Sequence, residues 1–210
     1  MIVILEVLVN PKHKDKEASM SLITKIFPLS SVVLPEGKMN LRIFEPRYKR
    51  LVKECCQNGE GFVICLVSDS NDTSPHNISQ IGTLVEIVDF ETLDDGLLGI
   101  TVYGKQRIRV KRVWSEHDGL RVGEIEHLPN WQTHSFGESS EHVAKQLQEV
   151  YQQFPQVKKL YEQCFFDDAT WVSQRWLELL PINQSKFDLL VSQDSCIATL
   201  DFLSDAIDSK

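Results

Sequence analysis

The sequence lacks the motifs that carry nucleotide binding and the common hydrolytic chemistries. A G-x-x-x-x-G-K-[ST] phosphate loop is missing, because neither of the two Gly-Lys pairs is followed by Ser or Thr. The G-x-S-x-G, H-E-x-x-H and calcium-loop patterns are missing as well. We therefore predict that the chain has no catalytic residue, needs no cofactor and is not an enzyme.

Long apolar runs are missing too, and none approaches the roughly 20 residues that a membrane-spanning helix needs. The five cysteines are odd in number and contain no C-x-x-C pair, which argues against a disulfide framework and a zinc knuckle. The six histidines lie mostly in expected turns and in the linker, so we predict no metal site. Together these absences predict a soluble, cytoplasmic protein with reduced thiols and no membrane partner.

The N-terminal segment, residues 1–19, has the composition of an extension. Its apolar start, Met1 to Val9, is short, carries Glu6 and has no cationic beginning, so it does not resemble a secretion signal. The residues that follow are polar and unpatterned. We expect residues 1–19 to be an appendage that is not native, with Met20 as the natural start.

Residues 20–128 show the pattern of a small β domain. Short apolar runs separated by glycine are typical of strands, and the clearest are residues 61–67 and 81–90. Asp95-Gly96 is the strongest hairpin signal in the chain and leads into a strand at 97–103. We expect Gly104 to turn the chain into another strand at 107–114, and Asp118-Gly119 to turn it into the last one.

One helix interrupts these strands. Apolar residues recur at the spacing of a single helix face: Tyr48, Leu51, Val52, Cys55 and Cys56. Pro46 suits the first turn, where its missing N–H has no intrahelical acceptor, and Gly59 can end the helix.

The C-terminal part reads as a linker, residues 129–138, followed by a helical bundle at 139–210. A first apolar stripe consists of Val143, Leu147, Val150, Tyr151 and Phe154, with Pro155 limiting that helix. Asp167 and Asp168 mark the start of a second helix, which Pro181 closes, and two further helical segments follow at about 185–191 and 194–207.

Two motifs resemble the opening of the N-terminal, substrate-binding domain of Lon proteases. These are the segment 26–37 (IFPLSSVVLPEG) and the segment 41–48 (LRIFEPRY), which match the family pattern nearly position for position. The resemblance extends, with weaker motifs, from about residue 25 to 207. It implies an α+β fold of the PUA-like superfamily, in which a β pseudo-barrel with one inserted helix precedes a C-terminal helical bundle.

The resemblance also implies a function. We expect a stand-alone, non-catalytic module that binds proteins or peptides, recognises unfolded or extended client segments, or acts as an adaptor for a protease. A weak homodimer is a further expectation. The candidate binding residues lie in the second motif, where we favour a structural role for them: Arg42, Phe44, Glu45, Arg47 and Tyr48.

Nucleic acid, in particular RNA bound through the PUA-like barrel, is the alternative partner. Four cations alternate along one expected strand and would line one of its faces: Lys105, Arg107, Arg109 and Lys111. However, the net charge of −8 disfavours the electrostatic attraction on which nucleic-acid affinity depends. We therefore favour a solvated face whose cations pair with acidic neighbours.

Overall fold

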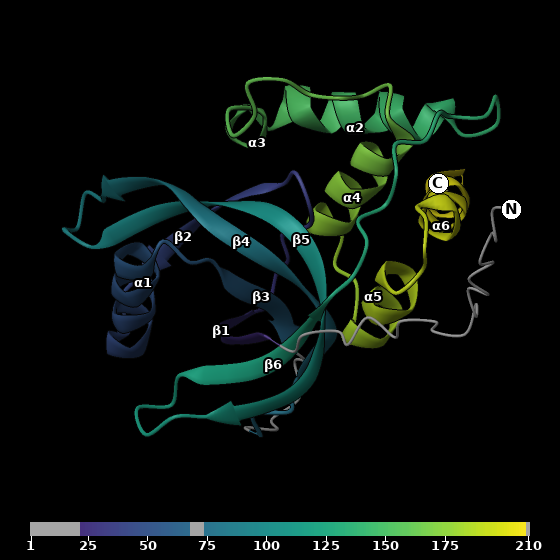
Figure 1. Cartoon of the computed structure of the whole chain (residues 1–210). Helices are drawn as coiled ribbons and strands as arrows, with labels where there is room; N and C mark the ends of the chain where they lie inside the picture. The colour runs from purple at the N-terminus through teal and green to yellow at the C-terminus, as the bar shows by residue number, and fades with distance from the viewer. Residues whose placement is uncertain (1–21, 68–73, 209–210) are drawn as a thin grey trace, which may run out of the picture.

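The computed structural model of the chain describes residues 22–67 and 74–208 (Figure 1). The predicted extension, residues 1–19, lies outside the described residues. The strands are β1 (Leu22–Leu29), β2 (Lys38–Ile43), β3 (Phe62–Val67), β4 (Ile78–Thr92), β5 (Leu98–Ser115) and β6 (Arg121–His127). The helices are α1 (Pro46–Asn58), α2 (Glu141–Gln153), α3 (Pro155–Lys158), α4 (Ala169–Leu179), α5 (Gln184–Val191) and α6 (Ile197–Asp208).

The six strands form one curled sheet in the order β2-β5-β4-β3-β1-β6. The long strand β5 pairs with β4 along most of its length, with β2 through its first part and with β6 through its last part. Because β6 also pairs with β1, the sheet comes round on itself. The β1–β3 pair is parallel and the other pairs are antiparallel.

Both predicted Asp-Gly turns are present, since Gly96 and Gly119 have positive φ angles of 80° and 81°. The predicted turn at Gly104 is wrong, because this residue lies inside the continuous strand β5. An added Cβ at Gly104 would collide with the carbonyl oxygen of Leu34, so the glycine permits a close approach of two backbones.

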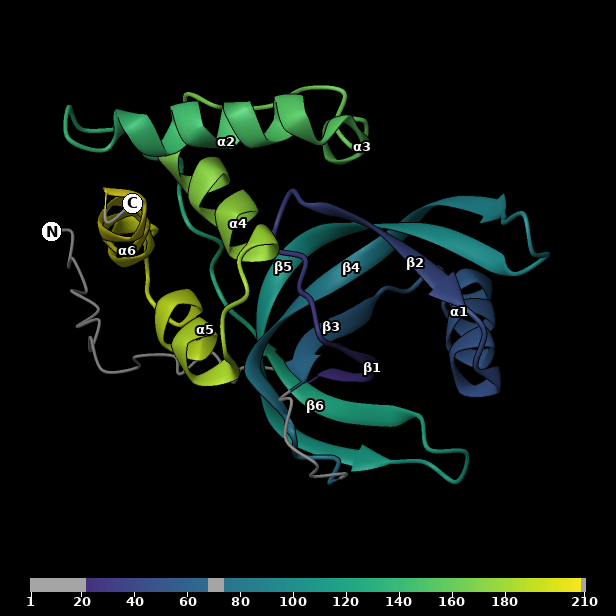
Figure 2. The same ribbon diagram turned by 180° about the vertical axis from the view of Figure 1, so that it is seen from behind.

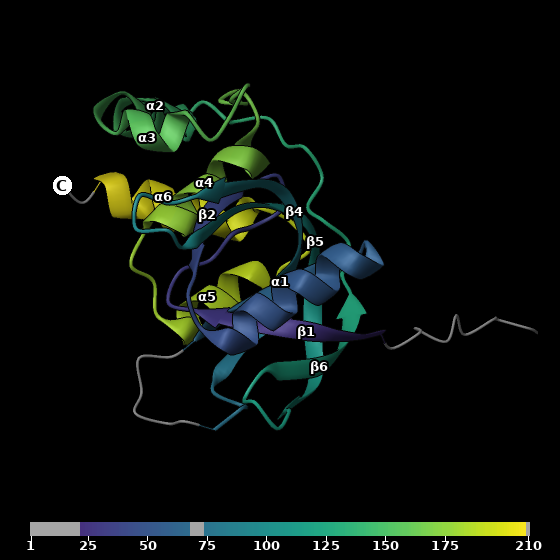
Figure 3. The same cartoon turned by 90° about the vertical axis from the view of Figure 1, so that its left-hand side faces the viewer.

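Helix α1 forms as predicted and covers the open side of the curled sheet (Figure 3). Its buried side chains are Tyr48, Leu51, Val52 and Cys55, whereas Cys56 is exposed. Tyr48 stacks on Phe27 of β1, with ring centroids 3.9 Å apart. Gly59 ends the helix with a φ of 67°, a left-handed conformation that glycine adopts without steric cost.

The remaining helices gather on the side of the sheet away from α1 (Figure 1). They share one apolar cluster with the sheet, to which Leu34 and Ile81 contribute beside Leu147, Trp171 and many other residues. Pro155 does limit α2, as predicted, and it also begins the short helix α3. No helix among the described residues has the length and apolar character of a membrane span. The predicted α+β class, with one helix inserted in the strands and helices after them, is confirmed.

Candidate binding site

The first sequence motif ends in a tight turn that contacts helix α4. In this turn the N–H of Gly37 donates to the carbonyl of Leu34 over 2.9 Å, and Glu36 has a positive φ of 64°. The N–H of Leu34 donates to Glu178 Oε1 over 2.7 Å, and Arg175 Nη2 donates to the carbonyl of Pro35 over 2.9 Å. The turn is therefore held by two side chains of α4.

Arg175 and Glu178 form a buried ion pair, with 2.7 Å between Nε of Arg175 and Oε2 of Glu178. The Arg175 side chain is 0% exposed and its guanidinium lies near the rings of Tyr161 and Trp171. Burial raises the pKa of the Glu178 carboxyl, and the charge of Arg175 opposes this rise. Each of the two charged groups therefore needs the other as its partner, because an unpaired charge in the protein interior costs several kcal/mol.

Beside this turn lies a groove of about 490 Å³, which we call the junction groove. One wall comes from the sheet side, namely Glu36, Lys38 and Tyr103, and the other from the segment before α4 and its first turn. That second wall includes Tyr161, Glu162, Phe165, Asp167, Asp168 and Trp171. Phe165 is 40% exposed, so an apolar ring faces the groove without a complete cover.

Strand β2 runs from the junction groove along the edge of the sheet toward α1 (Figure 2). Among the described residues it pairs with β5 alone. The carbonyl of Gly37 accepts from Gly104 of β5, so the backbone groups of the next residue, Lys38, point away from β5. Indeed the N–H of Lys38 donates to the Tyr161 hydroxyl over 3.2 Å.

The same alternation turns the N–H and C=O groups of Asn40 and Arg42 toward the outside of β2. Both residues are exposed, and no strand in the described part of the chain lies against them. Strand β2 therefore presents a short row of hydrogen-bonding groups to solvent, and this row begins at the junction groove. Sequence reasoning could not find this edge, because it depends on the order of the strands.

The structure gives the candidate residues of the second motif separate environments. Arg42 lies on the β2 edge and forms an ion pair with Asp95, while Phe44 is 60% exposed just beyond the strand. Glu45 is the N-cap residue of α1 and pairs with Arg47 over 2.7 Å, and Tyr48 is buried. Of the five, Arg42 and Phe44 are on the surface next to the free edge, and the others connect α1 to the sheet.

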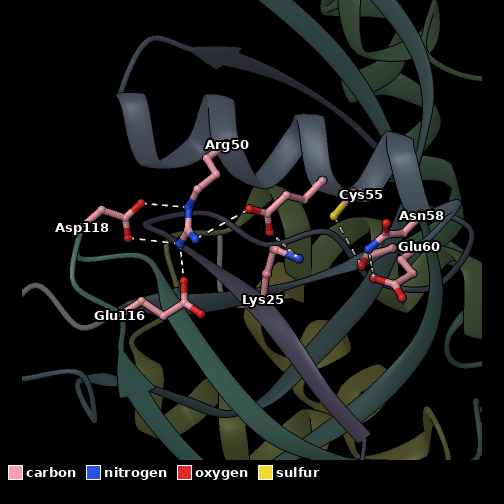
Figure 4. A network of polar contacts seen from close by, with 9 residues as sticks. Lys25, Arg50, Cys55, Asn58, Glu60, Glu116 and Asp118 are labelled. Atoms are coloured by element: carbon pink, nitrogen blue, oxygen red, sulfur yellow. Dashed lines mark hydrogen bonds and ion pairs between the residues drawn. The ribbon is translucent and has the colours of Figure 1, made fainter.

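Helix α1 is tied to the β5–β6 turn by a set of ion pairs (Figure 4). Arg50 pairs with Glu116 and, through Nε over 2.9 Å, with Asp118. Glu54 accepts from Lys25 of β1 over 3.0 Å. Because these side chains are partly exposed, the network fixes the position of α1 with little net stabilisation.

The four cations of the expected stripe do not share one environment. Lys105 pairs with Glu86, and both Arg109 and Lys111 pair with Glu126. Arg107 is only 3% exposed and donates to the carbonyls of Val191 and Gln193, over 2.7 and 2.9 Å, as well as to Pro129. Its guanidinium also lies over the Trp131 ring, 5.1 Å from the centroid.

Arg107 thus joins β5 to the segment after β6 and to the end of α5. Burial lowers the pKa of its guanidinium to about 10, which leaves it charged at neutral pH. A cation in an alternating strand looks exposed from sequence alone. Here the three carbonyls that accept from Arg107 come from segments far away in the chain and bury its side chain. Only three of the four cations of the expected stripe are therefore at the surface.

Comparisons with known proteins identify the relatives of this chain. The family model of the ATP-dependent protease La (LON) substrate-binding domain matches residues 24–194. The structure is similar to that of a Lon N-terminal domain protein from Xanthomonas campestris, with 30% sequence identity and a TM-score of 0.67. That match covers 87% of this chain and 96% of the other.

A second similar structure is the N-terminal domain of Mycobacterium avium complex Lon protease, with a TM-score of 0.56. This match covers 88% of this chain and 97% of that one, and its 13% identity supports the shared fold alone. The family match covers most of the chain and includes both sequence motifs, the turn at residues 34–37 and the β2 edge. The chain belongs to the family of the Lon (ATP-dependent protease La) substrate-binding domain.

Proposed function

We propose that this protein binds extended polypeptide segments as an additional strand on the free edge of β2. The observation that carries the proposal is the row of outward backbone groups at Asn40 and Arg42, which starts at the junction groove. Main-chain hydrogen bonds to such an edge provide affinity for many sequences, and a neighbouring pocket selects among side chains. This combination suits a module that must recognise unfolded or extended clients.

The side chains of β2 disfavour a second copy as the partner. In an antiparallel pair of β2 strands centred on Asn40, Lys38 of each copy would lie opposite Arg42 of the other. Like charges in directly opposed positions destabilise a strand pair. Cations on an edge strand are also a common protection against self-association. We therefore take a client polypeptide, not a second copy, as the occupant of this edge.

The role that we propose in a larger process is that of a module which binds a polypeptide segment but does not pull on it. A module of this kind holds a segment, and it can present that segment to a protease as an adaptor. The alternative of RNA binding gains no support from the charged strand, because Lys105, Arg109 and Lys111 pair with carboxylates and Arg107 is buried. We keep the cytoplasm as the predicted location.

The test is a fluorescence anisotropy titration with a labelled seven-residue peptide of alternating Thr and Val. We expect Asn40→Pro to abolish binding, since proline removes the outward N–H and is tolerated on an edge strand. Asn40→Ala is the matched control: it keeps the backbone donor and loses only the side-chain contact with Thr101, which measures 2.9 Å. This control should bind like the unmodified protein.

A second measurement leaves the protein unchanged, in case Asn40→Pro prevents folding. Methylation of alternate backbone nitrogens of the peptide removes the donors of the added strand while its side chains stay the same. We expect binding to disappear when the methyl groups are on the nitrogens that face β2. Equal affinity of methylated and unmethylated peptides would overturn the proposal.

A further inference from the structure

The junction groove carries an excess of negative charge. Its lining includes four carboxylates, Glu36, Glu162, Asp167 and Asp168, and one ammonium group, that of Lys38. Asp168 is committed to the start of α4, where its side chain accepts from the N–H of Thr170 over 2.9 Å. Glu36, Glu162 and Asp167 form no ion pair with any residue that the structure describes.

Aromatic rings lie among these carboxylates. Phe165 and Tyr103 belong to the lining, and Phe165 is partly exposed. The Tyr103 ring already contacts a cation, because the ammonium of Lys105 lies 5.5 Å from its centroid. Aromatic faces attract ammonium and guanidinium groups, and they also pack against the methylene stems of long basic side chains.

We propose that the junction groove selects a lysine or arginine side chain of the bound segment. This inference rests on the strand addition proposed above, which places the backbone of the segment along β2 and one of its side chains beside Lys38. The stem of that side chain would pack on Phe165, and its charged end would meet the carboxylates of Glu36, Glu162 and Asp167. A client with a basic residue at this position is complementary to the groove in both shape and charge.

Substitution of Lys38 should change the affinity for a basic peptide in the opposite direction to substitution of a carboxylate. Among the residues that the structure describes, the ammonium of Lys38 is the single cation of the groove lining, and it repels a basic client side chain. Replacing it with methionine keeps an apolar stem of similar length, and the backbone N–H that donates to Tyr161 stays in place. We expect Lys38→Met to strengthen the binding of a basic peptide, whereas loss of a carboxylate should weaken it.

The experiment uses the same strand peptide with lysine, leucine or glutamate at both terminal positions, so that one of them reaches the groove in either strand direction, titrated at about 50 mM and about 500 mM salt. We expect the lysine peptide to bind about three- to tenfold more tightly than the leucine peptide at low salt, and the glutamate peptide to bind most weakly. High salt should reduce these differences, because the carboxylates are partly exposed.

The double variant Glu162→Gln, Asp167→Asn should remove the lysine preference and leave the affinity for the leucine peptide unchanged. Glu149→Gln is the matched control, an exposed carboxylate of α2 outside the groove, and it should keep the preference. Equal binding of the lysine and leucine peptides, or a preference that survives in the double variant, would overturn the charge selection. In either case binding of the leucine peptide would leave strand addition intact, whereas failure of every peptide would count against the proposed function itself.

Discussion

The backbone N–H of Leu34 and the carboxylate of Glu178 are joined by a 2.7 Å hydrogen bond across 144 positions of the chain. This bond connects the first sequence motif to helix α4 and shares its acceptor with Arg175. The turn that begins the β2 edge is thus positioned by the helical part of the molecule.

Loss of either member of the Arg175–Glu178 pair should be strongly destabilising. We expect Arg175→Met and Glu178→Gln each to lower the free energy of unfolding by about 3 to 5 kcal/mol, because the remaining group stays buried without its partner. Urea denaturation measures the change. The exposed pair Lys145–Glu141 of α2 is the control, and Lys145→Met should change stability by less than about 0.5 kcal/mol. Equal effects of the two Met substitutions would contradict the prediction.

Gly37→Ala should disturb the contact between the turn at residues 34–37 and the Arg175–Glu178 pair, because it adds a methyl group to the turn. An added Cβ would collide with Glu178 Oε1 and lie 2.7 Å from Arg175 Nη2, so the ion pair would have to move. We expect a loss of roughly 1 to 3 kcal/mol in the free energy of unfolding. Gly137→Ala is the matched substitution, since the nearest atom to its Cβ is 4.0 Å away, and it should be almost neutral.

Arg107 and Arg109 are two positions apart on β5 and should respond differently to lysine. Arg107→Lys cannot reproduce the fork of bonds to Pro129, Val191 and Gln193, so we expect a loss of about 2 to 4 kcal/mol. Arg109→Lys keeps the charge beside Glu126 at a partly exposed site and should cost less than about 0.5 kcal/mol. Thermal and urea unfolding of the two variants provide the comparison, and similar losses would show that Arg107 is not a buried anchor.

Tyr161 should make the protein sensitive to alkaline pH. Burial, followed by the charge of Glu178, raises the pKa of its phenol from 10.0 to about 12. A raised pKa in the folded state contributes stability that is complete below pH 10 and is lost as the pH rises to 12. The loss should be about 2 to 3 kcal/mol.

The variant Tyr161→Phe isolates this contribution, because phenylalanine does not ionise. At pH 7 the variant lacks the bond to Lys38 and should be less stable by about 0.5 to 1.5 kcal/mol. Between pH 10 and 12 the difference should shrink and then reverse. Parallel stability curves for the two proteins across this range would disprove the assignment.

Arg50 should matter mainly at low salt. It pairs with Glu54, Glu116 and Asp118, yet its side chain is partly exposed. We expect Arg50→Gln to lower stability by about 1 kcal/mol at low ionic strength and by much less at about 1 M salt, where exposed ion pairs are screened. A loss that does not depend on salt would indicate packing of the arginine stem and not its charge.

Sequence patterns predicted the local elements of this molecule well. The apolar stripe of α1 and the two Asp-Gly turns depend on neighbours in the chain. The structure confirms both turns and all of the stripe except Cys56, which is exposed. Gly104 was misread because a glycine that admits a second backbone looks the same in sequence as a turn glycine. Local spacing contains no information on which distant backbone approaches.

The features of the candidate site were harder to predict for a similar reason. Tyr161 and Phe165 lie in the irregular segment between α3 and α4, which has no periodic pattern. The free edge of β2 follows from the strand order, in which β5 is its single strand neighbour among the described residues. The buried position of Arg107 follows from carbonyls of two separate segments, the one after β6 and the end of α5. Each of these depends on contacts between distant parts of the chain.

The bond between Leu34 and Glu178 also has a consequence during synthesis. The two residues are 144 positions apart, so a ribosome that adds about 5 to 20 residues per second needs roughly 7 to 30 s to supply the acceptor. Throughout this interval the nascent turn at residues 34–37 has none of its contacts with α4. The β2 edge would therefore acquire its final support only after residue 178 has been synthesised.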